Sequence, residues 1–262
     1  MLEVTDLTHV YGRGSGRHLA VDGISLQADQ GELVSIVGPS GCGKSTVLRC
    51  IAGLLPPARG TITVNGTAVH GTVPDGLAVV FQDYSRSLYP WLSVRDNVAL
   101  PLRRTRRGRA QRRGDAQQAL AAVGLDDTAH RYPWQLSGGM QQRVAIARAI
   151  ACDPVLLLMD EPFGSVDAQT REDLEDLVLR LRRDRGITIL LVTHDIDESV
   201  YTGDRVVVLT PGPGRVRASL PVGLPAPRDQ TATRELPEFV HLRAEVSRLV
   251  RSRTAEATPR RG

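Results

Sequence analysis

The sequence LVSIVGPSGCGKST, residues 33–46, decides the fold. It begins with an apolar run of strand length, Leu33–Val37, and continues as a glycine-rich stretch that matches G-x-x-x-x-G-K-[ST]. Glycines allow the backbone to curl until successive N–H groups point at phosphate oxygens. A helix predicted over Thr46–Ala52, with Gly53 placed to end it, would direct the positive end of its dipole at the same anion. The stretch therefore predicts a strand, a phosphate-binding loop and a helix.

This loop contains the only lysine of the chain. Of the 33 Lys and Arg residues, 32 are Arg and one is Lys44. A compact ammonium on a flexible stem can reach between the β- and γ-phosphates of a nucleotide, where a planar guanidinium is too broad. We therefore expect Lys44 to act on the phosphates, and the hydroxyl of Ser45 to ligate Mg²⁺. The expected nucleotide-binding residues of the loop are Gly38, Pro39, Ser40, Gly41, Cys42, Gly43, Lys44, Ser45 and Thr46.

Apolar runs and helical patterns alternate along the rest of the chain. Continuous apolar strands separated by helices are typical of a parallel sheet covered on both faces. Residues 61–69 combine two short strands with an Asn65-Gly66 turn, which predicts an antiparallel hairpin. Apolar residues at helical spacing in 174–181 predict an amphipathic helix. Further strands are predicted over Leu77–Phe81, Val155–Met159, Ile187–Thr193 and Arg205–Leu209.

The middle of the chain, about residues 93–150, has little strand pattern and much Arg, Ala and Gln, which predicts a helical insertion. The expected fold class is α/β: a P-loop NTPase core with a parallel sheet, a small antiparallel β subdomain and this insertion. The predicted domain covers residues 1–220, with a helical subdomain at about 90–150. Residues 221–262 are predicted to form a short extension with one helix and a disordered tail from Ser252. The apolar face of that helix consists of Phe239, Leu242, Val246 and Leu249.

Composition excludes several classes of protein. An apolar fraction of 41% with 24% charged residues is ordinary for a globular protein, and the net charge is +4. No apolar run approaches the roughly 18 to 20 residues that span a bilayer, and residues 1–6 do not form a signal peptide. Three cysteines without a CxxC pair indicate reduced thiols. We therefore expect a cytosolic protein.

Two predicted strands end in residues that suit phosphate chemistry. Asp160 and Glu161 follow one of them; Asp160 suits the shell of Mg²⁺, and Glu161 suits a general base acting on the attacking water. Alone, such a pair can simply end a strand, but beside a P-loop it indicates a metal site. His194 follows another strand in the same way, and open α/β sheets bind ligands at the carboxyl ends of their strands.

The segment LSGGMQQR, residues 136–143, resembles the signature motif of ATP-binding cassette (ABC) ATPases, and the three motifs occur in the order that this family has. The resemblance covers roughly residues 2–220 and implies ATP hydrolysis with Mg²⁺. It implies adenine stacking for Tyr11, although this tyrosine could equally be a core residue. It implies catalytic roles for Glu161, His194, Gln82 and Lys44, and Mg²⁺ ligation by Ser45, Gln82 and Asp160. It also implies nucleotide contacts of Asp167, and of Ser137, Gly138 and Gly139 from a partner chain.

The resemblance also implies partners. Two copies pair head to tail in this family, and a helix capped by Ser137 would direct its first amides at an anion. A lone ATPase module resembles an importer subunit, and the segments 81–83, 89–91, 132–135 and 204–209 resemble the nitrate/sulfonate/taurine group. We expect integral membrane permease subunits, an extracytoplasmic solute-binding protein acting indirectly, and a peripheral location on the cytoplasmic face of the membrane. Residues 83–91 are expected to contact the permease.

The arginine-rich run at residues 103–113 permits a second interpretation, a non-transport ABC ATPase that acts on nucleic acid. A solvated face of the helical insertion, or one facing anionic lipid headgroups, is the simpler interpretation, because no aromatic residues interleave for base stacking. We therefore expect no nucleic-acid partner.

Overall fold

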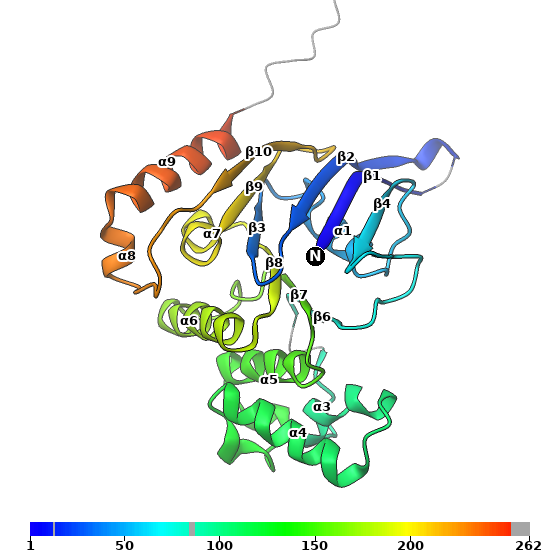
Figure 1. Ribbon diagram of the computed structural model, residues 1–262, viewed down its shortest axis with the longest axis vertical. Coiled ribbons are helices and arrows are strands. Elements are labelled where there is room, and N and C mark those ends of the chain that lie inside the picture. Colours follow the sequence, from blue (N-terminus) through cyan, green and yellow to red (C-terminus); the bar gives the residue numbers. More distant parts are fainter. Residues whose placement is uncertain (13, 84–86, 253–262) are drawn as a thin grey trace, which may run out of the picture. The chain divides into compact units, whose positions relative to one another are not determined.

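The computed structural model describes residues 1–12, 14–83 and 87–252 (Figure 1). The chain divides into two compact units, which we describe separately. The first unit consists of Met1–Ala28, Leu33–Thr72 and Val192–Gly262; the second consists of Asp29–Glu32 and Val73–Leu191.

An antiparallel sheet forms part of the first unit, with the strand order β2-β1-β4-β5 (Figure 1). The predicted hairpin is confirmed, with Asn65 and Gly66 both at positive φ in its turn. The sheet is larger than this hairpin because β1 and β2 join it. The hydrophobic pattern did not delimit β1, since a register shift between Val4 and Leu7, with Asp6 at φ 53°, interrupts the alternation. The strands are β1 (Leu2–Tyr11), β2 (His18–Ala28), β4 (Arg59–Val64) and β5 (Thr67–Ala68).

Parallel strands in the first unit carry the phosphate-binding loop. All five residues of β3 are buried, and β3 pairs in parallel with β9, with Ile36 opposite Val207. The helix after the loop begins at Lys44, two residues before the predicted start. β10 pairs antiparallel with β9 after residues 211–214, Pro-Gly-Pro-Gly. The elements are β3 (Leu33–Val37), α1 (Lys44–Ile51), α7 (Ile196–Thr202), β9 (Arg205–Leu209) and β10 (Val216–Pro221); a short 3-10 turn, η1, covers Gly14–Gly16.

The C-terminal part of the first unit contains α8 (Ala232–Glu235) and α9 (Pro237–Arg251). The predicted helix corresponds to α9, which buries Phe239 and Val246. The short helix α8 before it was not predicted, so residues 221–252 contain two helices and not one. An ion pair between Arg243 and Asp197 links α9 to α7. The predicted disordered tail lies almost wholly in 253–262, outside the described residues.

The second unit combines strands with the helical insertion. β6 and β7 pair in parallel, with Val80 opposite Met159, and every residue of β7 is buried. The predicted apolar face in 174–181 is confirmed as the buried face of α6. The strands and this helix are β6 (Leu77–Val80), β7 (Leu156–Asp160), α6 (Ala168–Arg185) and β8 (Thr188–Val192), whose last residue belongs to the first unit. The expected α/β fold with parallel strands is therefore confirmed.

The predicted helical insertion is also confirmed, because α3, α4 and α5 pack against one another (Figure 1). Among the described residues, no helix is both long enough and apolar enough to cross a membrane. The helices are α3 (Val94–Ala99), α4 (Arg109–Ala122) and α5 (Gly138–Ile150), with 3-10 turns η2 (Pro101–Arg104), η3 (Asp126–Thr128) and η4 (Pro133–Gln135).

Candidate functional site

The loop between β3 and α1 has a backbone that only glycine can provide at Gly43. Its φ is 95°, in the left-handed region, and a Cβ there would lie 2.4 Å from Cγ1 of Val21 and 2.8 Å from the backbone oxygen of Ala20. Gly41 also has a positive φ, 76°, but a Cβ there would meet no atom within 4 Å. The loop is therefore curled and packed tightly against β2 at its last glycine.

Lys44 is held across this loop. The Nζ atom donates to the carbonyl oxygens of Gly38 at 2.8 Å and Pro39 at 3.2 Å, and the residue is only 6% exposed. An ammonium has three N–H donors, so these two carbonyls fix its position while one donor remains for a phosphate oxygen. The ammonium is thus placed by backbone atoms of the loop that it serves.

Two other predicted loop residues, Cys42 and Gly38, offer main-chain atoms rather than side chains to a ligand. Cys42 is fully buried, its N–H donates to the carbonyl of Pro39 at 3.2 Å, and burial raises the pKa of its thiol. The Cys42 thiol is therefore a packing group, and any ligand contact of this residue must come from its main chain. Gly38 is equally confined, because a Cβ there would lie 2.8 Å from Sγ of Cys42.

Tyr11 lies beside the same loop. Its hydroxyl is 3.2 Å from Oγ1 of Thr46, and its ring meets that of His9 edge to face with centroids 4.6 Å apart. The side chain is nevertheless exposed, at 37%. Tyr11 is therefore not a core residue, and its ring can present a face to a base.

His194 is exposed and follows β8 in the first unit. The preceding Thr193 donates its N–H to the carbonyl of Ile36 at 3.1 Å, so the residues that follow β8 lie beside the end of β3. The next residue, Asp195, caps α7 by accepting from the N–H groups of Asp197 and Glu198. His194 is thus fixed between a strand end and a capped helix, in the unit that contains the P-loop.

In the second unit, Gln82 and Glu161 meet. Each lies two positions beyond a paired residue of β6 and β7, and Nε2 of Gln82 donates to Oε2 of Glu161 at 3.0 Å. Glu161 has φ 45°, a left-handed conformation that costs a non-glycine residue energy and is typical of functional sites. Asp160, the last residue of β7, is 5% exposed.

These residues fit Mg²⁺, which prefers hard oxygen ligands and keeps several waters. The amide nitrogen of Gln82 is engaged with Glu161, which leaves the amide oxygen as its metal-ligating atom. In the second unit, Asp160 adds carboxylate oxygens. In the first unit, Ser45 carries the hydroxyl that the motif assigns to the metal. Among the described residues there is no cluster of three or more His, Cys, Asp or Glu side chains that could hold a metal ion.

The signature and Asp167 are brought together in the second unit by a residue that the sequence reasoning missed. Ser137 caps α5, since its hydroxyl accepts from the N–H of Met140 at 3.3 Å, as predicted. Asp167 caps α6 by accepting from the N–H of Thr170 at 3.0 Å and from its hydroxyl at 2.7 Å, and these hydrogen bonds lower the Asp167 pKa. A Cβ on Gly139 would lie 2.4 Å from Cγ2 of Thr170. The Asp-x-x-Thr spacing signals the cap of α6, but the approach of Gly139 depends on how α5 packs against α6.

A second missed residue, Asn97, organises residues 87–93. It is fully buried; its Oδ1 accepts from the N–H of Tyr89 at 2.8 Å, and its Nδ2 donates to the carbonyls of Tyr89, Leu92 and Ser93. Arg148 of α5 holds the same segment by donating to Ser87. Asn97 lies in the range predicted to be a helical insertion, and no motif in the sequence marks it.

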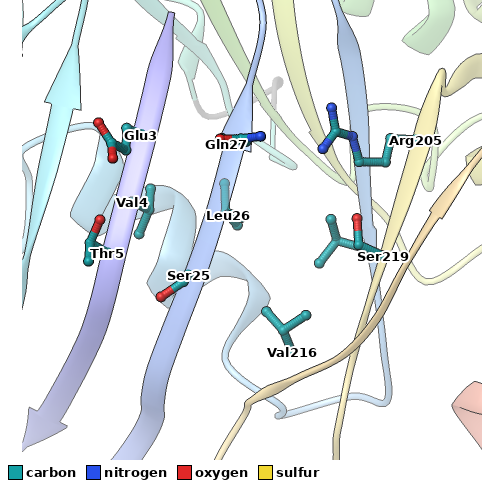
Figure 2. Close-up of a pocket in the computed structure, with 10 residues that line it drawn as sticks. Glu3, Val4, Thr5, Ser25, Leu26, Gln27, Arg205, Val216 and Ser219 are labelled. Atoms are coloured by element: carbon teal, nitrogen blue, oxygen red, sulfur yellow. The ribbon is translucent and has the colours of Figure 1, made fainter.

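The first unit also contains a cavity of about 330 Å³, which lies apart from the predicted site residues (Figure 2). Side chains of β1 and β2, among them Glu3 and Gln27, line one part of it, and Arg205, Val216 and Ser219 line another. None of the residues that line it belongs to the predicted site.

Comparison with known proteins agrees with these motifs. Residues 21–164 match the family model described as ABC transporter. The chain is 42% identical over 262 residues to the nitrate import ATP-binding protein NrtD of Synechocystis, covering 98% of this chain and 97% of that protein. It is 44% identical over 236 residues to the bicarbonate transport ATP-binding protein CmpC of Synechococcus elongatus, but spans only 35% of that protein's length.

Solved structures agree as well. A dimeric ATP-binding cassette in a post-hydrolysis state, bound to ADP and Pi, has a TM-score of 0.74 at 34% identity over 85% of this chain and 99% of the other. CbiO1 of Clostridium perfringens, part of the cbiONQ transporter complex, has a TM-score of 0.76 at 28% identity over 84% of this chain and 88% of the other. The chain therefore belongs to the ABC transporter family and is homologous to a nitrate import ATP-binding protein and a bicarbonate transport ATP-binding protein.

Proposed function

We propose that this chain hydrolyses ATP to ADP and phosphate and thereby powers import through a separate permease. The observation that supports hydrolysis most directly is the hydrogen bond between Gln82 and Glu161 at the ends of a parallel strand pair. Glu161 accepts the proton of the water that attacks the γ-phosphate, while Gln82 fixes the orientation of its carboxylate. The importer role rests on the similarity over the full length to a nitrate import ATP-binding protein.

The remaining site residues take roles in this proposal. Lys44 and the loop amides bind the β- and γ-phosphates, and the face of Tyr11 stacks on adenine. His194 contacts the γ-phosphate. Ser45, Gln82 and Asp160 would hold Mg²⁺, which would neutralise charge on the phosphates when bound. Each role is supported by the position of its residue at a strand end, a loop or a helix start.

A second copy of the chain completes the site. The amides behind Ser137, at the start of α5, form a second place for an anion, and the nucleotide of one copy would face Ser137, Gly138 and Gly139 of the other. Asp167 belongs to the same surface because Thr170 links it to Gly139. The solved dimeric cassette supports pairing of two copies.

An aromatic surface in the helical insertion supports contact with a permease. Both tryptophans of the chain are 70% exposed, and each lies in a Tyr-Pro-Trp segment whose two rings pack together. Hydrogen bonds from Val94 to Arg131 and from Arg95 to Ala129 tie the two segments to each other. Exposed apolar patches of this kind mark interaction sites. The surface consists of Tyr89, Trp91, Tyr132 and Trp134.

The solute is proposed to be a small oxyanion of the nitrate type, since relatives are named for nitrate and bicarbonate. The sulfonate and taurine solutes remain part of this prediction, together with a solute-binding protein and a peripheral location at the cytoplasmic face. No observation favours action on nucleic acid.

Glu161→Gln tests the proposal. Loss of the base is expected to lower ATP turnover by about 100-fold or more, while the Kd for ATP stays close to that of the wild type. In the presence of ATP, the Glu161→Gln variant should elute as a dimer on size-exclusion chromatography. Glu238→Gln, which neutralises an exposed carboxylate on α9, is the matched control. Wild-type turnover in the Glu161 variant would refute the assignment of the base.

A further inference from the structure

A cavity of about 500 Å³ lies within the helical insertion, on residues to which the ATPase mechanism gives no role. It is formed where α3, η2 and the first turn of α4 face one another, and all its lining residues belong to the second unit. A volume of this size accommodates a small organic ligand. Four cationic side chains and one carboxylate line it: Arg103, Arg109, Arg112, Arg113 and Asp96.

The four cavity arginines differ from the neighbouring Arg107 in their ion pairs. Arg107 forms ion pairs with Asp115 at 3.0 Å and Asp153 at 3.4 Å, and these hydrogen bonds raise its pKa. Among residues 1–12, 14–83 and 87–252, none of the four cavity arginines forms an ion pair or a side-chain hydrogen bond. The carboxylate of Asp96 is already engaged, since it accepts from the hydroxyl of Ser93 at 2.9 Å. Four guanidinium groups therefore line the cavity beside a single carboxylate, which leaves the cavity with an excess of positive charge.

The position of these charges on α4 is unfavourable without an anion. Arg109, Arg112 and Arg113 lie in the first turns of the helix, where the dipole is positive, and that first turn has no acidic residue. Cations normally stabilise the other end of a helix. A local conflict of this kind is expected where a sequence serves binding rather than stability.

We propose that this cavity binds an anion carrying a phosphate group, either a free phosphorylated molecule or the phosphate of a lipid headgroup. A guanidinium group can donate two parallel hydrogen bonds to the oxygens of one phosphate. Four guanidinium groups around one cavity can therefore bind an anion with more than one negative charge. Asp96 can accept a hydrogen bond from a hydroxyl group of the same ligand. No aromatic side chain lines the cavity, so it offers no stacking surface to a nucleobase.

The test uses full-length protein with Lys44→Ala, so that binding at the P-loop is weakened in every sample. Calorimetry with inorganic pyrophosphate is compared between this background, the background with Arg112→Gln and Arg113→Gln, and the background with Arg248→Gln and Arg251→Gln. Both pairs remove two positive charges from helix positions, so the control matches net charge. The cavity pair should raise the Kd at least about tenfold, because each hydrogen bond between charged groups is worth about that much, whereas the control pair should change it less than about twofold.

A second arm identifies the source of the phosphate. The same proteins are sedimented with vesicles of phosphatidylglycerol in phosphatidylcholine and with phosphatidylcholine alone. Binding to pyrophosphate without sedimentation supports a free ligand, and loss of sedimentation only in the cavity pair supports a headgroup. If the cavity pair does not fold, as judged by its melting temperature, Arg103→Gln with Arg109→Gln replaces it.

Three results would overturn the proposal. One is equal binding of both probes by the cavity pair and the control pair. Another is binding of neither probe by the background. The third is binding of polyglutamate in preference to pyrophosphate, which would identify an acidic protein segment as the partner.

Discussion

Gly43 directly precedes α1 and Gly139 is the second residue of α5, the two helices that the proposed mechanism directs at phosphates, and both glycines are closely packed. A Cβ on either glycine would lie 2.4 Å from another atom. At Gly43 that atom is Cγ1 of Val21, the backbone oxygen of Ala20 follows at 2.8 Å, and φ is 95°. At Gly139 it is the methyl carbon of Thr170, and the backbone is helical. The first glycine is required by the backbone and the second by a neighbouring side chain.

This difference indicates how each half of the site is built. The P-loop is a backbone structure, and its tight curl is set by glycine conformations and by the adjoining strand. The signature is a packing structure, in which α5 approaches α6 closely enough to contact the residue that binds Asp167. Substitutions can separate these two causes.

Gly43→Ala should have the largest effect. Strain at positive φ and the clash with the Ala20 backbone should together reduce ATP affinity by about 100-fold or more. Val21→Ala, which removes the nearest atom, should not restore binding, because the backbone clash and the strain remain. Gly41→Ala is the matched control, since its φ of 76° is strained but no atom lies within 4 Å, and it should lose less affinity.

Nucleotide titration measures the ATP affinity, and thermal unfolding the stability, of the wild type, Gly43→Ala, the Gly43→Ala and Val21→Ala double variant, and Gly41→Ala. Recovery of binding in the Gly43→Ala and Val21→Ala double variant would show that the P-loop, like the signature, is limited only by side-chain packing.

Gly139→Ala should have a smaller effect, a loss of stability that a second substitution at Thr170 reverses. Overpacking against Thr170 is expected to lower the free energy of unfolding by about 1–3 kcal/mol. Thr170→Ser removes the contacting methyl group and keeps the hydroxyl that donates to Asp167, so the double variant should regain most of the loss. Denaturant unfolding of the single and double variants decides the matter. If Thr170→Ser gave no recovery, the glycine would be needed for another reason than this contact.

Some of the site could be predicted because its signals are local in the sequence. The P-loop, the Asp160-Glu161 pair and the Ser137 cap each depend on a few neighbouring residues and on strand or helix ends. Residues such as Asn97 and Thr170 could not be found in this way, since their partners are set by how helices and loops pack.

The arginine run shows the same limit. From sequence, Arg107 and Arg112 are equivalent members of a basic segment. In the structure, Arg107 pairs with two aspartates, one of them 46 residues away, while Arg112 lines a cavity. Likewise, the bulge at Asp6 shifts the alternation of β1, so a strict period of two did not delimit this strand.

Lys44→Arg tests the central claim most directly, because it keeps the positive charge and changes only the shape of the cation. The ammonium lies in a 6% exposed place, between two carbonyls that a planar guanidinium cannot contact in the same way. Steady-state ATP hydrolysis by the purified chain should fall by about 100-fold while the melting temperature changes little, as expected when charge stabilisation at the phosphates is misplaced. Turnover close to that of the wild type would contradict the account of a P-loop ATPase whose single lysine acts on the phosphates.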